Sequence, residues 1–309
     1  MNEQQLKLRQ TLLTGTNIAP IFGKSKFRTA YDIYCGKKGL LERTPPTAAM
    51  IRGTFLEVAI LDYYQADHGV ELERDLGTVV HTAEDWMGAS PDAVYTTEEG
   101  TVIVDAKTSR RKDGWGVPGS DDVPDDYQLQ LHWYAAVLRS HEKYRNIKRL
   151  DVIVYFPVHD EFCTYSIEPN VEFEQKLIER ARDWWYKHIV CSVAPPMDHS
   201  TSACRMADSQ PYEAPDMEEV DEAEGLLIRD LIQVKSDIDE LVKQKKTLEN
   251  QIKVIIGSKA GIYDNTNRAT WKEQKGRSGF DQKSFKTDHP ELYEQYKKEG
   301  KPFRVLRIK

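Results

Sequence analysis

The sequence has few cysteines and no long apolar run, and both absences narrow the kinds of protein that it can encode. No stretch of about 18 or more apolar residues occurs, which excludes a membrane-spanning helix. The first residues lack a basic region followed by an apolar stretch, so we expect no secretory signal. The cysteines form no C-x-x-C pair, which favours a reduced compartment over a disulfide scaffold or a zinc site. They are Cys35, Cys163, Cys191 and Cys204. We therefore expect a soluble cytoplasmic protein.

The charge is unevenly distributed along the chain. The 309 residues, of which 39% are hydrophobic and 30% charged, fit one large globular domain or two smaller ones. The net charge of −7 argues weakly against nucleic-acid binding. However, residues 1–43 hold 8 Lys and Arg against 3 Asp and Glu, and residues 268–309 hold 12 against 6. Phosphate binding needs only a local positive surface. Both ends are therefore candidates for contact with nucleic acid, although ordinary solvated charge remains an alternative.

Apolar periodicity and turn residues predict helices and strands in the first two thirds of the chain. The clearest strand is 101–107, T-V-I-V-D-A-K, which is rich in β-branched residues and follows the turn Glu98-Glu99-Gly100. Segment 87–95 predicts a strand that Gly88 and Pro91 interrupt. We expect helices at 47–66, 124–140 and 171–190, and further strands at 76–82 and 151–158.

The composition changes after residue 193. We predict a core at 1–193, a linker at 194–217, a long helix or coiled coil at 218–257, and a basic hairpin and tail at 258–309 that could pack on the core. The long helix is predicted from apolar residues spaced by threes and fours, which form a seam along one face of the helix. Lys245 occupies the one position of this seam that should be apolar. The seam could pair between chains or fold back as a helical hairpin, or the helix could pack on its own domain. Its apolar residues are Leu227, Leu231, Val234, Ile238, Leu241, Leu248, Ile252 and Ile255.

The last residues combine lysines with aromatic side chains and end in the strand-like segment 303–309, F-R-V-L-R-I-K. Such interleaving suits contact with DNA. The alternative is that the aromatic side chains fold the tail onto the body of the protein. They are Trp271, Phe280, Phe285, Tyr293, Tyr296 and Phe303.

A carboxylate and an ammonium group lie close together on the strongest predicted strand. Asp105 and Lys107 project to the same side, since side chains alternate along a strand. Charges on an inner strand are costly unless they are paired or bind a metal. The turn that contains Asp92 offers a second carboxylate. If Asp92 and Asp105 lie on neighbouring strands, their oxygens could share a Mg²⁺ ion, with Lys107 orienting a water molecule and offsetting charge on a phosphate.

The neighbouring predicted helices add polar candidates. Glu57 follows Gly53 by four residues, on the same face as the apolar stripe, so it should point inward and need a partner such as a metal. A salt-bridged or exposed glutamate is the alternative. Gln128, Gln130 and Tyr134 lie on the helix that follows the active strand. They could hold a phosphate or a water molecule, or serve simple packing.

With these residues in view, the segment 17–155 resembles the lambda-exonuclease-like branch of the PD-(D/E)xK nucleases, also called YqaJ-like viral recombinases. Five pieces in family order carry the resemblance: I-A-P-I-F-G-K-S-K-F-R, R-G-T-F-L-E, G-A-S-P-D-A-V, V-D-A-K-T-S and Y-Q-L-Q-L-H-W-Y. The second acidic residue is Asp105, where the family more often has glutamate. The resemblance implies an α/β (α+β) restriction-endonuclease-like core, with a central mixed β-sheet flanked by helices and a C-terminal helical extension.

Site roles follow from the resemblance. Asp92, Asp105 and the Ala106 carbonyl would bind Mg²⁺, for which Mn²⁺ could substitute, and Lys107 would position the water molecule. Glu57 would support the metal site, and Gln128 would support catalysis. Ser25, Lys26 and Arg28 match the family's segment near the 5′ phosphate. The further residues expected to contact DNA are Arg52, Ser109, Tyr127 and Gln130.

The resemblance also implies an activity and partners. Relatives digest one strand of a duplex from its end, 5′ to 3′, and leave a 3′ overhang. They form ring-shaped trimers and act beside a single-strand annealing protein in phage or prophage recombination. We therefore expect a homo-oligomer that acts on double-stranded DNA ends in the cytoplasm of a bacterial host.

Two other functions remain open. An endonuclease would use the same catalytic residues, and a non-catalytic DNA-binding scaffold would use the long helix to assemble partners. The iron–sulfur branch of these nucleases is excluded, because the cysteines lack the clustered spacing that such a site requires.

Overall fold

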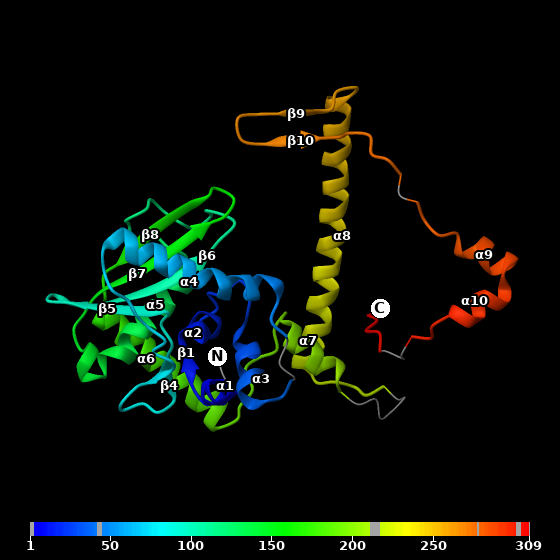
Figure 1. Cartoon of the computed structure of the whole chain (residues 1–309). Coiled ribbons are helices and arrows are strands. Elements are labelled where there is room, and N and C mark those ends of the chain that lie inside the picture. Colours follow the sequence, from blue (N-terminus) through cyan, green and yellow to red (C-terminus); the bar gives the residue numbers. More distant parts are fainter. Residues whose placement is uncertain (1–2, 42–44, 211–216, 277, 301–303, 309) are drawn as a thin grey trace. The chain divides into compact units, whose positions relative to one another are not determined.

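The computed structural model describes residues 3–41, 45–210, 217–276, 278–300 and 304–308. The chain divides into two compact units, Met1–Gln210 and Pro211–Lys309, whose elements are labelled in Figure 1. Within the described ranges, no helix is both long enough and apolar enough to cross a membrane.

A mixed five-stranded sheet forms the centre of the first unit. Its strand order is β2-β5-β6-β7-β8, in which β6 and β7 are parallel and the other neighbours are antiparallel. The inner strand β6 is the strand predicted most clearly, with one additional residue at each end. The strands are β2 (Glu73–Arg74), β5 (Ala93–Thr97), β6 (Gly100–Thr108), β7 (Ile147–Phe156) and β8 (Glu161–Ile167).

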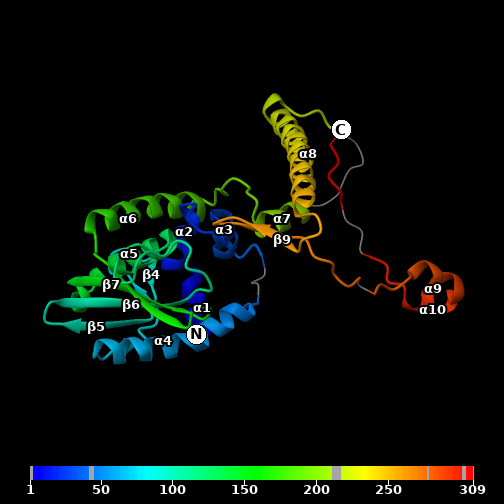
Figure 2. The same cartoon turned by 90° about the horizontal axis from the view of Figure 1, so that it is seen from above.

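Helices cover both faces of this sheet, as Figure 2 shows. On one face, Ile60, Leu61 and Tyr64 of α4 (Ala48–His68) pack in an apolar cluster with Val102 and Val104 of β6. The other face packs against α5 (Asp125–Arg139). Along the chain, a 3-10 turn (Glu142–Tyr144) follows α5. After the last two strands come α6 (Val171–Trp185) and its π-helical extension (Tyr186–Val190). The predicted fold class, a central mixed sheet flanked by helices, is confirmed.

The N-terminal elements build a second, smaller sheet. Its strand order is β1-β4-β3, with β1 at Leu13–Thr14, β4 at Met87–Ala89 and β3 at Val79–Val80. The predicted strand at 76–82 is therefore reduced to β3. The predicted strand at 87–95 is divided between the two sheets, because Pro91 has no amide hydrogen for a ladder and its φ is fixed. The helices of this region are α1 (Glu3–Gln10), α2 (Gly15–Ile21) and α3 (Ala30–Lys38).

The sheet differs from the prediction at its last strands. β7 begins at Ile147, four residues before the expected start at 151, and β8 was not predicted. In β8 the buried residues Cys163, Tyr165 and Ile167 alternate with less buried neighbours, which is the period-two pattern of a strand with one covered face.

The predicted linker at 194–217 contains a helix that belongs to the first unit, so this prediction was wrong in part. Ser200 caps α7 (Thr201–Asp208) by accepting a hydrogen bond from the Ala203 amide. Ala203 is buried against Tyr31 and Tyr34 of α3. A short helix with one small apolar contact gives little periodicity, and its Ser, Pro and Asp neighbours resemble a loop. Residues 211–216 of the predicted linker lie outside the described residues.

The second unit begins with the long helix α8 (Glu222–Ile256), as predicted. A hairpin of β9 (Gly261–Tyr263) and β10 (Arg268–Thr270) follows, and Asp264 in its turn accepts hydrogen bonds from the amides of Thr266 and Asn267. Two short helices, α9 (Gln282–Asp288) and α10 (Pro290–Tyr296), were not predicted. The predicted strand at 303–309 does not form at 304–308, and its first and last residues lie outside the described residues.

A buried carboxylate fastens α4 to the sheet. Asp151 of β7 is 0% exposed and accepts hydrogen bonds from the Tyr64 hydroxyl, from Arg149 Nε at 2.8 Å and from Ser166 Oγ at 2.9 Å. A buried charge needs such a set of donors, because it has lost its hydration. Of these three hydrogen-bond donors, only Tyr64 belongs to α4. Its hydroxyl therefore links the helix that carries Glu57 to the central sheet.

We expect Tyr64→Phe to lower the free energy of unfolding by about 1.5–3 kcal/mol, because it removes a hydrogen bond to a charged, buried group. Urea denaturation followed by tryptophan fluorescence measures this loss. Tyr63→Phe is the matched control, since the Tyr63 ring stacks on Phe162 and the residue is 42% exposed, and it should change stability by less than about 0.5 kcal/mol. Equal stability of both variants would contradict the role given to Tyr64.

Candidate active site

Asp92 and Asp105 lie side by side because of the register of β5 on β6. Ala93, the first residue of β5, is opposite Val104, so the preceding residue Asp92 falls beside Asp105. The Ala106 amide donates a hydrogen bond to Asp92 Oδ2 at 2.8 Å, which fixes this carboxylate against the strand. The backbone thus brings together the two carboxylates that the sequence pattern singled out.

Asp105 is almost completely buried, with 1% of its surface exposed, and Lys107 pairs with it. The Lys107 ammonium group forms an ion pair with Asp105 Oδ2 and lies 5.5 Å from the centre of the Tyr127 ring. Gln130 Nε2 donates a hydrogen bond to Asp105 Oδ1 at 3.3 Å. Asp105 Oδ1 therefore has a hydrogen-bond donor, whereas the buried Oδ2 has the ion pair with Lys107 but no hydrogen bond from the described residues.

The charges in this cluster shift one another's protonation equilibria. Burial, with a further contribution from Asp105, raises the pKa of Asp92 well above its usual range. Burial alone would lower the pKa of Lys107, but the charges of Asp105 and Asp92 outweigh it and raise this pKa overall. Burial also raises the pKa of Glu57. The charge of Lys107 lowers this pKa, and the charge of Asp105 raises it further. Lys107 therefore remains an ammonium group, whereas burial disfavours the ionised forms of Asp92 and Glu57.

Glu57 faces this cluster from α4. It is half-buried, and the charges of both Lys107 and Asp105 act on it. The prediction that Glu57 points inward is thus consistent with its surroundings, whereas its role at a metal stays a prediction.

The donor set fits a hard divalent cation. Carboxylate and main-chain carbonyl oxygens are the ligands that Mg²⁺ prefers, and Mg²⁺ commonly uses only one or two carboxylates together with water and substrate oxygens. Within the described part of the chain, no group of three or more His, Cys, Asp and Glu side chains is gathered closely enough to hold a metal ion. A cation here would therefore be held by Asp92 and Asp105, with the Ala106 carbonyl and solvent or phosphate oxygens completing its shell.

Residues 4–141 match the family model of the YqaJ-like viral recombinase domain. The N-terminal part of the chain is therefore similar to that family. The chain is also 23% identical to the protein YqaJ of Bacillus subtilis strain 168 over 297 residues, which covers 94% of this chain and 89% of that protein.

Solved structures of two exonucleases are similar to the chain. One is an alkaline exonuclease from Laribacter hongkongensis, with a TM-score of 0.47, 17% identity and coverage of 60% of this chain and 92% of that chain. Another is a phage-related exonuclease from Haemophilus somnus 129PT, with a TM-score of 0.43, 12% identity and coverage of 61% and 99%.

The structure places Gln128 away from the two carboxylates, and its role in catalysis stays a prediction. Its Nε2 donates a hydrogen bond to the Asp121 carbonyl at 2.7 Å, and its side chain lines a pocket with His132 and Asn170. Residues two apart on a helix point about 200° apart, so Gln128 faces away when Gln130 faces Asp105. Gln130, predicted as a DNA contact, is the glutamine at the site.

Sequence reasoning missed the residue that allows α5 to approach α2 closely. A Cβ atom at Gly15 would lie 2.6 Å from the Tyr134 ring and 3.0 Å from Gln130 Cγ. Tyr134 in turn accepts a hydrogen bond from Gln130 Nε2 at 2.7 Å. Gly15 therefore lets the α5 side chains reach Asp105. A lone glycine after a strand gave no signal, because its role depends on a helix more than a hundred residues away.

The predicted DNA contacts lie on four different segments of the first unit. Ser25, Lys26 and Arg28 lie in the loop between α2 and α3, where Ser25 Oγ accepts hydrogen bonds from the amides of Phe27 and Arg28. The charge of Lys26 acts on Asp126, in the first turn of α5.

The remaining predicted DNA contacts lie on other elements. Arg52 is exposed on α4, and Ser109 directly follows β6 and donates a hydrogen bond to the Arg111 carbonyl. Tyr127 and Gln130 adjoin Lys107 and Asp105. Contact of any of these residues with DNA stays a prediction.

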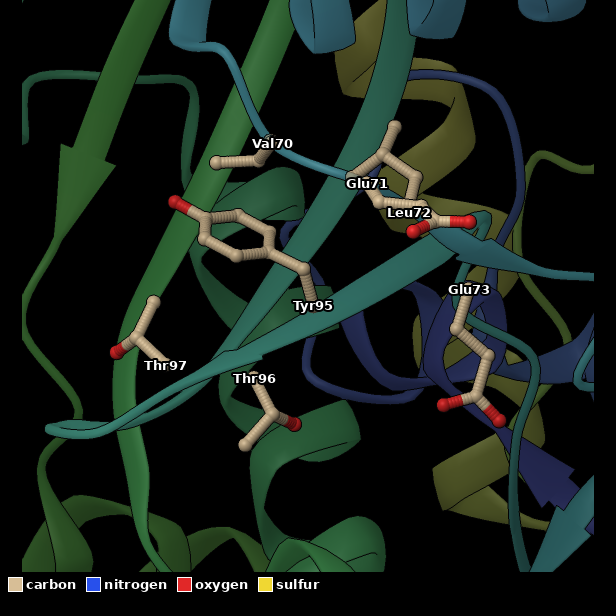
Figure 3. Close-up of a pocket in the computed structure, with 7 residues that line it drawn as sticks. All are labelled: Val70, Glu71, Leu72, Glu73, Tyr95, Thr96 and Thr97. Carbon is tan, nitrogen blue, oxygen red and sulfur yellow. The ribbon is translucent and has the colours of Figure 1, made fainter.

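An open pocket on the first unit lies away from the carboxylates. Figure 3 shows its lining side chains, which come from residues 70–73 and from the far end of β5. Thr97 at that end is five residues beyond Asp92, or about 16 Å along the strand. Because it holds none of the predicted site residues, we give this pocket no part in the chemistry.

We expect Gly15→Ala to lower the free energy of unfolding by about 1–3 kcal/mol, because the added methyl group overlaps Tyr134. Gly53→Ala is the matched control. A Cβ atom there meets nothing within 4 Å, so this change inside α4 should stabilise the chain by about 0.5–1 kcal/mol. Chemical denaturation measures both values, and a neutral Gly15→Ala would show that α2 and α5 are not closely packed.

Proposed function

We propose that the chain is a Mg²⁺-dependent deoxyribonuclease that digests double-stranded DNA from its ends, 5′ to 3′. It would leave 3′ single-stranded overhangs for recombination of phage or prophage DNA in a bacterial cytoplasm. The observation that carries this proposal is the placement of Asp92 beside Asp105, with Lys107 paired to Asp105. The match of residues 4–141 to the YqaJ-like viral recombinase domain supports the choice of DNA as the substrate.

Asp92, Asp105 and the Ala106 carbonyl would hold the cation, and Mn²⁺ could replace Mg²⁺ there. When bound, such an ion polarises the scissile phosphodiester and lowers the pKa of a neighbouring water molecule. Asp105 is fixed for this task by burial and by Gln130, and Asp92 is fixed by the Ala106 amide.

Lys107 acts as a fixed positive charge rather than as a general base. Its pKa is raised by Asp105 and Asp92 in spite of burial, so it carries no free electron pair at neutral pH. A cation at this position can orient the attacking water molecule and stabilise the charge that develops on the phosphate. Glu57, which faces Lys107, would help to keep this ammonium group in place.

The same residues could serve an endonuclease, so the substrate distinguishes the two activities. The proposed homo-oligomer, a ring of three by resemblance, and the proposed annealing partner concern later steps of recombination and do not affect this chemistry.

We expect the chain to release label from 5′-labelled linear duplexes first, only with Mg²⁺ or Mn²⁺ present, and EDTA should stop the digestion. Lys107→Ala should slow it by about a hundredfold or more while duplex binding survives. Lys148→Ala is the control, since Lys148 pairs with Glu99 at the other end of β6. Prior release of a 3′ label would reverse the direction, and cleavage of closed circular duplexes would indicate an endonuclease. Digestion in the presence of EDTA would contradict the proposed dependence on a divalent metal ion.

We also expect the two glutamines of α5 to differ. Gln130→Ala should reduce the digestion rate roughly 10- to 100-fold, because it removes the hydrogen bond that orients Asp105. Gln128→Ala, on the opposite face, should leave the rate within about twofold. Initial rates on the same linear duplex give both values. A larger loss of rate for Gln128→Ala than for Gln130→Ala would support the catalytic role predicted for Gln128.

A further inference from the structure

The long helix α8 presents an apolar seam that its own unit leaves uncovered. Among the described residues of this unit, the β9–β10 hairpin packs only near the end of the helix, where Ile256 is 2% exposed. Earlier seam residues such as Leu241 and Leu248 are 61% and 58% exposed. A helix of 35 residues is about 50 Å long, and an apolar stripe of that length normally lies against another element.

The seam follows the first and fourth positions of successive heptads. Leu231, Ile238, Lys245 and Ile252 occupy the first position, a, and Leu227, Val234, Leu241, Leu248 and Ile255 occupy the fourth, d. Such a pattern is typical of helices that pair with another helix of the same kind.

Lys245 determines which orientation of a pair is tolerated. In a parallel pair, each a position meets the same position of the other helix, so two Lys245 ammonium groups would approach each other in the seam. In an antiparallel pair, a positions meet d positions, and Lys245 lies opposite Leu241 of the second copy. The Lys245 stem can then cover apolar surface while its ammonium group stays near Glu249, with which it pairs at 3.6 Å.

The residues that flank the seam favour the same orientation. In the antiparallel register that pairs Leu241 with Lys245, Lys235 of each copy lies beside Glu249 of the other. The two-fold axis passes near Val242, which lies outside the seam and is 58% exposed. Pairing would give Val242 an apolar neighbour, the Val242 of the second copy. Charges at these flanking positions decide partner and orientation in coiled coils.

We propose that α8 pairs with α8 of a second copy of this chain as an antiparallel two-stranded coiled coil. Its seam is formed by residues 231–255, and two Lys235–Glu249 ion pairs between the copies fix its register. This pairing would join two nuclease units and does not depend on the proposed activity.

Single charge reversals test the pairing in the full-length chain. Lys235→Glu places Glu beside Glu249 twice, and Glu249→Lys places Lys beside Lys235 twice, so each variant alone should raise the dimer Kd about tenfold or more. An equal mixture of the two variants restores both opposite-charge pairs and should recover the wild-type mass. Light scattering over a range of concentrations measures the mass. For the wild type it should be an even multiple of 35.6 kDa, whether α8 joins two single chains or two of the proposed rings of three.

The mixture separates pairing from damage to the helix. Each substitution also alters charges within its own helix, such as the Lys245–Glu249 pair, and those effects persist after mixing. Recovery in the mixture therefore reports contact between copies. Glu240→Lys and Lys243→Glu, whose side chains pair with each other at 3.6 Å on the outward side, are the matched controls and should leave the mass unchanged.

Three outcomes would overturn the proposal. A wild-type chain that stays monomeric at about 100 μM would mean that the seam has no second copy as its partner. Masses that neither reversal changes would point to packing of α8 on its own chain. Reversals that weaken association without recovery in the mixture would indicate a parallel pair, in which position 235 meets Asp230 of the other helix.

Discussion

Two carboxyl groups that lie side by side with little hydration disfavour each other's ionisation, and the elements of the first unit hold them together in spite of this. Asp105 cannot turn toward solvent, because it is 1% exposed on an inner strand, and Asp92 is held by the Ala106 amide. Lys107 supplies one positive charge, whereas Asp92, Asp105 and Glu57 bring up to three negative ones. The backbone thus holds carboxyl groups together where a bound cation would favour their ionised forms, and this arrangement exists before any ligand arrives.

The surrounding helices are held in place, which prevents the carboxyl groups of the site from moving apart. Behind Asp105, α5 is held close by the packing of Tyr134 over Gly15 and by a hydrogen bond from Trp133 Nε1 to the Gly88 carbonyl at 3.0 Å. On the other face, Tyr64 ties the second half of α4 to buried Asp151. The first half of α4 has exposed side chains such as Phe55, so Glu57 lies between the fastened and the exposed parts of its helix. Rigid support of this kind is what keeps charged groups within reach of one another.

Local patterns in the sequence predicted those features that local chemistry determines. The strand β6 and the helices α4, α5 and α8 follow from β-branched runs, apolar periodicity and turn residues. The D-A-K spacing placed Asp105 and Lys107 on one face. The choice between Gln128 and Gln130 could not be made in this way, because it depends on which face of α5 meets the sheet. α7 and the function of Gly15 depend on contacts between distant segments, and β8 was missed because only three buried residues mark it.

Each unit contains a lysine whose charge restricts what can lie opposite it: Lys107 is largely buried, and Lys245 is exposed within an apolar seam. Lys107 is acceptable only beside carboxylates, and it has them within its own unit. Lys245 has Glu249 at the edge of its seam, but nothing in its own unit covers the apolar residues on either side of it, among those that the structure describes. A polar residue at such a position weakens a coiled coil and in return excludes the arrangements that would bring two like charges together. A leucine there would strengthen parallel and antiparallel pairs alike, so the lysine is best understood as the residue that selects orientation.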